Sequence, residues 1–120
     1  MKPYQDARVE GEKLAKQYAE LEQADQVDFF NGSEAYYSVL GHNKKQEAIA
    51  VLIEKNDHKI YVYQLDKGIS QDKAATISRE KGASDIDKVT FGRYQDKPIW
   101  EVKSGNHYYL IDFETGAVIQ

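Results

Sequence analysis

Four apolar positions occur twice along this chain, at a nearly constant offset of 62 or 63 residues. The matching pairs are Val27 and Val89, Phe29 and Phe91, Tyr37 and Trp100, and Val39 and Val102. In each half these positions follow a helical pattern and alternate as strand residues do, which indicates an internal duplication. The alternative is chance agreement between two segments of the same type. We therefore expect an α+β fold of two tandem units, each a helix packed on an antiparallel β-sheet.

The first unit begins with a helical pattern and continues as a series of strands. Its apolar residues recur at alternating intervals of three and four, which predicts a helix over about residues 4–24. From Val27 the pattern has a period of two, and Asn31 and Gly32 are expected to supply positive φ angles in a tight hairpin turn. Three further strands are predicted, over 35–40, 47–55 and 59–65.

The second unit repeats this order. Ser70 is expected to cap a short helix that ends at Gly82, because a serine hydroxyl can accept an amide hydrogen bond and glycine favours a left-handed helix terminus. Strands are predicted over 86–93, 98–103, 107–113 and 117–120. Alternation places Trp100 on the side of its strand that faces the helix, where it should be buried. We place the boundary so that the units span 1–66 and 67–120.

The composition excludes several classes of function. With 16 basic and 20 acidic residues the net charge is −4, so the chain lacks the positive surface that drives non-specific nucleic-acid binding. The absence of cysteine excludes thiol nucleophiles, disulfides and cysteine-bound metals. The longest apolar run, residues 48–53, is far shorter than the roughly 20 residues of a membrane-spanning helix. The first unit holds 8 basic and 12 acidic residues, which fits a solvated surface or a basic partner.

Residues suited to catalysis or metal binding form no recognisable motif. His42, His58 and His107 fall in or beside predicted turns, at spacings that match no zinc motif. No serine lies in a nucleophile motif, and the glycines form no phosphate-binding loop. Asp112 and Glu114 could act as an acid–base pair, but such residues beside Thr-Gly usually bond the backbone of their own turn. We expect no catalytic residues, no cofactor and no metal.

Nine tyrosines exceed the needs of a small core, and alternation separates them by face. If Tyr37 and Tyr109 face the helices, Tyr36 and Tyr108 project from the opposite faces of the sheets. Because tyrosine is enriched at protein interfaces, these two residues are the candidate partner surface, and the acidic segment 6–22 is the next place to look. The alternative is that the two tyrosines decorate half-exposed sheets, where tyrosine also packs well.

Residues 68–120 resemble a PepSY domain. They contain a capped helix with central alanines, a P-x-W-E-V strand and the sequence Y-x-x-D-x-x-T-G-x-V, of which the terminal IDFETGAVI run is the most specific part. Residues 4–65 are similar to the domain that precedes PepSY in the YpmB/TseB-like proteins of Gram-positive bacteria. The shared elements are V-x-x-F-x-G at residues 27–32 and Y-x-V-x-G at residues 37–41.

This resemblance implies two small cystatin-like units outside the cytoplasmic membrane, with no catalytic residues and no cofactor. TseB-like proteins regulate cell-wall elongation through a penicillin-binding protein, which implies a non-enzymatic protein-interaction module of the envelope. PepSY domains also occur in peptidase propeptides, so the alternative is a module that inhibits a peptidase.

The same resemblance carries expectations about location and partners. Proteins of this family have one membrane-spanning helix before this region, so we expect Met1 to be an artificial start from which that anchor was removed. The expected partner is an envelope protein, either a penicillin-binding protein or a peptidase. We expect no nucleic-acid partner, and membrane contact only through the anchor.

Overall fold

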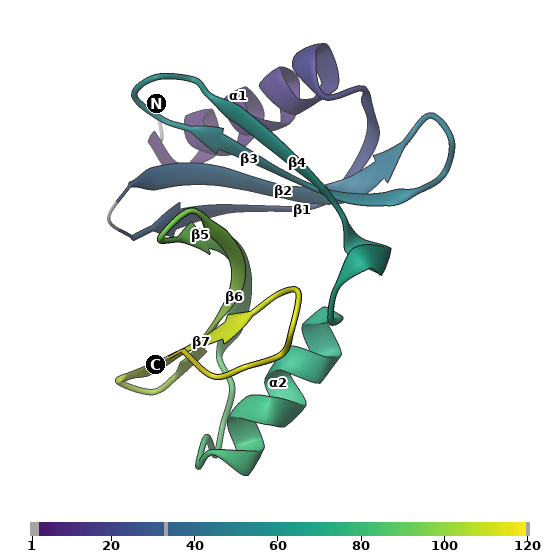
Figure 1. Ribbon diagram of the computed structural model, residues 1–120. Coiled ribbons are helices and arrows are strands. Elements are labelled where there is room, and N and C mark those ends of the chain that lie inside the picture. Colours follow the sequence, from purple (N-terminus) through teal and green to yellow (C-terminus); the bar gives the residue numbers. More distant parts are fainter. Residues whose placement is uncertain (1–2, 33, 120) are drawn as a thin grey trace. The chain divides into compact units, whose positions relative to one another are not determined.

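Residues 3–32 and 34–119 are described by the computed structural model shown in Figure 1. The chain divides into two units, Met1–Gln64 and Leu65–Gln120, and each is considered by itself. The boundary predicted between residues 66 and 67 falls inside a 3-10 turn, η1 (Leu65–Lys67), that follows the first unit. Among the described residues, neither α-helix combines the length with the hydrophobicity that a membrane-spanning segment needs.

The first unit is a helix on a four-stranded antiparallel sheet (Figure 1). Its elements are α1 (Pro3–Tyr18), β1 (Leu21–Asn31), β2 (Ala35–Asn43), β3 (Ala48–Glu54) and β4 (Ile60–Gln64). The strands lie in chain order because short turns connect them. The buried core between helix and sheet consists of Ala15, Leu21, Val27, Tyr37, Val39, Ile49, Val51 and Ile53. Gly11 permits the close approach of α1, since a Cβ at this position would lie 3.1 Å from Cβ of Tyr37.

The helix α1 ends at Tyr18 rather than at residue 24, and residues 21–24 belong to β1. The predicted end was wrong because two register shifts, one between Leu21 and Gln23 and one between Ala24 and Gln26, interrupt the alternation of β1. Leu21, Ala24 and Val27 thereby all contribute to the core at intervals of three, which imitates the spacing of a helix.

The strands β1 and β2 form the predicted hairpin, with Asn31 paired to Ala35. The positive φ angles expected at Asn31 and Gly32 are wrong, since neither residue adopts the left-handed conformation. Gly32 instead makes room for Phe30, because a Cβ there would lie 2.8 Å from the phenylalanine ring. A close contact, and not an unusual backbone angle, therefore explains this glycine.

The second unit is a shorter helix on a three-stranded antiparallel sheet of order β5-β6-β7. Its elements are α2 (Gln71–Glu80), β5 (Lys88–Tyr94), β6 (Lys97–Ser104) and β7 (His107–Asp112). The predicted cap is confirmed: the side chain of Ser70 accepts a hydrogen bond of 3.0 Å from the backbone N–H of Lys73. Gly82 follows the helix with a φ of 114°, a conformation that favours glycine.

Three aromatic rings form the centre of the second unit. The centroid of Phe91 lies 5.0 Å from that of Trp100 and 5.1 Å from that of Phe113. Trp100 is 1% exposed, which confirms the burial predicted from alternation. Its indole N–H donates a hydrogen bond of 3.0 Å to the carbonyl of Ile69, so the polar atom of this buried side chain is satisfied.

The strand predicted over 117–120 is reduced to a single bridge between Ile111 and Val118, and Gln120 lies outside the described residues. The segment still follows the edge of β7, because the N–H of Ile119 donates to the carbonyl of Leu110. The N–H of Asp112 likewise donates to the carbonyl of Ala117. These bonds cover part of the β7 edge without forming a continuous ladder.

Candidate functional site

Tyr108 is the exposed member of the predicted partner surface. It is the second residue of β7, opposite Lys103 of β6, and it is 54% exposed. The register pairs Trp100 with Ile111, and side chains alternate along β7, so Tyr108 lies on the face of the sheet away from Trp100. Its face is therefore the one that alternation predicts. That Tyr108 binds a partner stays a prediction.

Tyr36 is not an exposed surface residue, which corrects the expectation that it projects freely from its sheet. Alternation places it on the face opposite Tyr37, but it is only 3% exposed. Its ring packs against those of Phe30 and Tyr61, each with a centroid distance of 6.3 Å. Replacing Tyr36 would therefore disturb packing, so it cannot serve as a simple probe of partner binding.

A sequence signal for this burial existed in β3. Its residues read as an almost continuous apolar run, and six of its seven positions are buried. Val51 belongs to the α1-facing core, while Leu52, on the other face, is 0% exposed. A strand of that kind indicates a sheet with buried side chains on both faces. Tyr36 pairs with Glu54 at the end of β3, so it belongs to this sheet. Alternation gives the face of a residue, but not its exposure.

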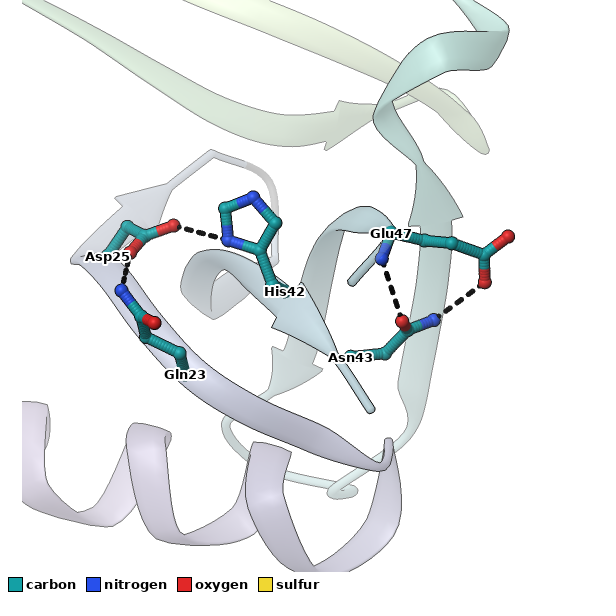
Figure 2. A network of polar contacts seen from close by, with 5 residues as sticks. All are labelled: Gln23, Asp25, His42, Asn43 and Glu47. Carbon is teal, nitrogen blue, oxygen red and sulfur yellow. Dashed lines mark hydrogen bonds and ion pairs between the residues drawn. The ribbon is translucent and has the colours of Figure 1, made fainter. Parts of the chain in front are cut away.

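A polar network lies at one end of the first sheet (Figure 2). Nδ1 of His42 is 2.9 Å from Oδ2 of Asp25, and Nε2 of Gln23 donates a hydrogen bond of 2.7 Å to Oδ1 of the same carboxylate. Asp25 falls at a register shift of β1, and such a bulge turns a side chain out of the regular alternation. The sequence patterns missed this contact because they placed residues 23 and 25 in and beside a helix.

The His42–Asp25 pair lies at the solvent-exposed surface, where it can form hydrogen bonds. Both side chains are 40% exposed, so water screens their attraction and the pair contributes little to stability. The neighbouring Asn43 closes the β2–β3 turn: its Oδ1 accepts hydrogen bonds from the N–H groups of Lys45 and Glu47, at 2.9 and 3.0 Å. Its Nδ2 donates to Oε1 of Glu47 at 2.9 Å, as Figure 2 shows. These Asn43 bonds are local and serve the turn.

Asp112 has the turn role that its sequence context favours. Its Oδ1 accepts hydrogen bonds from the backbone N–H groups of Glu114 and Thr115, at 2.8 and 3.0 Å. The hydroxyl of Thr115 accepts another from the N–H of Ala117 at 3.1 Å, and Gly116 has a φ of 81°. The carboxylate of Asp112 is thus occupied by the backbone of its own turn.

The histidines occupy separate places. His42 pairs with Ala48 at the start of β3, whereas His58 follows the end of that strand with a φ of 56°. His107 opens β7 in the second unit. Within residues 3–32 and 34–119, no three His, Asp or Glu side chains lie close enough together to hold a metal ion.

Two carboxyl groups have a raised pKa. For Glu54, at the buried end of β3, desolvation raises the pKa most, and the hydrogen bond and negative charge of Asp57 raise it further. For Glu101 in β6, burial raises the pKa and the positive charge of Lys88 opposes this. Both groups therefore favour their protonated form more than a free glutamate does.

Comparisons with known proteins agree with this fold. Residues 10–54 match the family described as the cell wall elongation regulator TseB-like domain. The chain is 35% identical, over 113 residues, to the probable cell wall elongation regulator TseB of Bacillus subtilis (strain 168), a match that covers 88% of this chain and 70% of that protein. The solved structure of the YpmB protein from Bacillus subtilis is similar with a TM-score of 0.76 at 32% identity, covering 100% of this chain and 96% of that one. The likeness therefore extends over both units and confirms the predicted α+β fold class.

Proposed function

This chain belongs to the TseB-like family of cell wall elongation regulators, and we propose that it regulates cell-wall elongation by binding an envelope protein, without a catalytic step of its own. The observation that carries this proposal is the 35% identity to the Bacillus subtilis regulator over 113 residues. The matching fold of both units supports it. The absence of a catalytic motif in the sequence is consistent with a binding role.

Tyr108 is the residue through which we expect contact with the partner. The residue is 54% exposed and lies on the sheet face that α2 does not cover. Lys103, directly across the strand pair, adds an exposed positive charge beside the ring. Tyrosine is enriched among the residues that contribute most to binding at protein interfaces, which makes the ring of Tyr108 the main candidate contact.

The finer parts of the proposal rest on the family resemblance. We propose an extracytoplasmic location, a membrane-spanning anchor before this region, and a penicillin-binding protein as the partner. The second unit acts as a PepSY domain in this proposal. Inhibition of a peptidase is the alternative that the same resemblance supports, and one experiment separates the two.

The experiment is photo-crosslinking in intact cells that express the full gene product. A photoreactive phenylalanine derivative replaces Tyr108 in one variant and Tyr18 in a matched control, since Tyr18 is also an exposed tyrosine, on α1. Crosslinked proteins are identified by mass spectrometry. We expect a penicillin-binding protein to be captured from position 108 and not from position 18.

Other outcomes redirect the proposal in defined ways. Capture of a peptidase at position 108 would replace wall regulation by peptidase inhibition. Capture only at position 18 would move the contact to α1, which carries part of the acidic segment named from the sequence. If neither position captures an envelope protein, the proposed mode of action is wrong.

A further inference from the structure

Three of the four edges of the described sheets carry a feature that hinders the addition of another strand over part of their length. In the edge strand β1, two register shifts at Leu21/Gln23 and Ala24/Gln26 interrupt the first half, and the pairing with β2 is regular from Gln26 to Asn31. On β5, Nε2 of Gln71 donates a hydrogen bond of 2.9 Å to the carbonyl of Val89. Residues 117–119 follow the edge of β7. Bulges and covering groups of this kind are the usual protection of edge strands against further pairing.

The fourth edge, β4, has none of these features. Its five residues pair with β3 in one continuous register, and no strand of the described chain lies beyond it. Val62 stands at its centre and is 48% exposed. Val62 pairs with Val51 of the α1-facing core, so it lies on the helix side of the sheet. An exposed, regular edge with a central aliphatic side chain is a site for strand addition.

The hydrogen-bond pattern shows which groups face outward. The N–H of Glu54 donates to the carbonyl of Lys59 at 2.8 Å, so this pair is of the hydrogen-bonded type. Such pairs alternate along an antiparallel ladder, and Tyr61 and Tyr63 therefore direct their backbone groups toward β3. The N–H and C=O groups of Ile60, Val62 and Gln64 consequently point away from β3, at the outer edge.

We propose that β4 pairs with β4 of a second copy of this chain, antiparallel and about a two-fold axis at Val62. Each of the three outward residues then donates and accepts backbone hydrogen bonds: Val62 pairs with Val62, and Ile60 pairs with Gln64 of the second copy. Tyr61 comes beside Tyr63 of the second copy on the other face. The strand is self-complementary, as a two-fold interface requires.

The charges favour a second copy as the occupant. The sequence of β4, IYVYQ, contains no charged residue, so two copies meet there without like-charge repulsion despite the net charge of −4 on each chain. The antiparallel arrangement also brings residues 57–59, just before the strand, beside residues 65–67 of the second copy, just after it. Each of these flanks holds one acidic and one basic residue, so the flanks add no net repulsion between the two copies.

The size of the contact sets its strength. A pair of five-residue strands buries much less than the roughly 1,600 Å² of a standard stable interface. The dimer is therefore weak, concentration-dependent and suited to covalent trapping. Because a monomer could also regulate an envelope partner, this inference is independent of the proposed function, and either can fail alone.

The chain contains no cysteine, so a single introduced thiol gives a clean test. In Val62→Cys the two thiols lie across the axis, whereas the matched control Val9→Cys places a thiol at another exposed valine, on α1. Both variants are oxidised at equal concentration, and disulfide-linked dimer is followed on non-reducing gels. We expect Val62→Cys to form dimer at least about tenfold faster than Val9→Cys, because pairing holds its thiols within bonding range.

A second measurement excludes an effect of the thiol itself. Sedimentation equilibrium of the unmodified protein should show self-association, and Val62→Lys should weaken it at least about tenfold, since lysine on an edge strand opposes pairing. Val9→Lys should leave it unchanged. Equal oxidation rates for the two cysteine variants, or an unmodified protein that stays monomeric at millimolar concentration, would overturn the proposal.

Discussion

The hairpins β1–β2 and β5–β6 contain the same residue pattern in the same register, but the corresponding phenylalanines differ in how deeply they are buried. In the first, Val27 pairs with Val39 and Phe29 with Tyr37; in the second, Val89 pairs with Val102 and Phe91 with Trp100. The aromatic rings meet edge to face in both, with centroids 5.9 Å apart in the first hairpin and 5.0 Å in the second. The four positions that recur in the sequence are therefore cross-strand partners in each unit, as a duplication predicts.

The two phenylalanines nevertheless differ in exposure. Phe91 is fully buried and packs against a third ring, that of Phe113. Phe29 is 42% exposed, and the amine of Lys55 lies 5.6 Å from the centre of its ring. Register and ring geometry are thus common to both hairpins, while the stability that each aromatic pair contributes depends on what covers it.

The largest difference in the loss of unfolding free energy is expected between Phe91→Ala and Phe29→Ala. Removing the buried ring of Phe91 should lower the free energy of unfolding by about 3 to 5 kcal/mol, because it leaves a cavity in the core. Removing the half-exposed ring of Phe29 should cost only about 1 kcal/mol. Urea unfolding measures both, and Trp100, the single tryptophan, reports on the second unit by fluorescence. Equal losses for the two variants would show that the pairs are energetically equivalent.

A smaller difference is expected between Tyr36→Ala and Tyr108→Ala, the two tyrosines that alternation treats alike. Tyr36 is buried, and its loss should cost about 2 to 4 kcal/mol. Tyr108 is exposed, and its loss should change stability by no more than about 0.5 kcal/mol. Thermal unfolding followed by circular dichroism provides the measurement. A stable Tyr36→Ala protein would restore Tyr36 as a candidate contact residue.

The two hairpins also differ at one more pair of corresponding cross-strand positions, and this difference should affect how stability depends on pH. Ser38 lies opposite Asp28 in the first hairpin, and Glu101 lies opposite Thr90 at the corresponding place in the second. Because burial raises the pKa of Glu101 in the folded state, its contribution is fully present below the ordinary value of 4.5 and is lost as the pH rises through the raised value. Glu101→Gln should therefore increase the free energy of unfolding relative to the parent chain, and this increase should be larger at pH 7 than at pH 4.5.

Denaturant melts of Glu101→Gln and of the parent chain at several pH values provide the test. The control is Glu80→Gln, which changes an exposed glutamate of the same unit. If both substitutions shift the pH profile equally, burial of Glu101 is not the cause of the effect.

The smallest effect is expected from chelation. The histidines are separated, and Asp112 is bonded to the backbone of its own turn, so a chelator should leave the melting temperature of both units unchanged. Differential scanning calorimetry with and without chelator checks this. A fall of several degrees that one divalent ion reverses would assign a metal to the chain and make Asp112 and Glu114 candidate ligands.

Local patterns predicted a large part of this fold. Apolar spacing located both helices and seven strands, a serine followed by a helical pattern located the cap of α2, and alternation assigned Trp100 to the buried face. These features depend on residues within a few positions of each other or on the pleat of a strand, so a sequence displays them directly. The motifs at residues 27–32 and 37–41 also indicated the TseB-like family that the comparisons show.

The candidate site was predictable only in part. Alternation assigned the face of Tyr108, and its exposure agrees with a surface role. The contact between Asp25 and His42 was not predictable, because it depends on a bulge in β1 that brings together residues far apart in sequence. The same bulges gave β1 a helical spacing and hid the true end of α1.

Periodicity and turn residues act locally, so the order of the elements and the helix-facing side of residues such as Trp100 could be predicted from the sequence. Only the folded chain shows that Tyr36 is buried while Tyr108 is exposed, and that β4 lies at the edge of its sheet with a continuous register. Exposure and edge position depend on what packs beyond a strand. No residue of that strand encodes this, since burial is a property of the assembled chain.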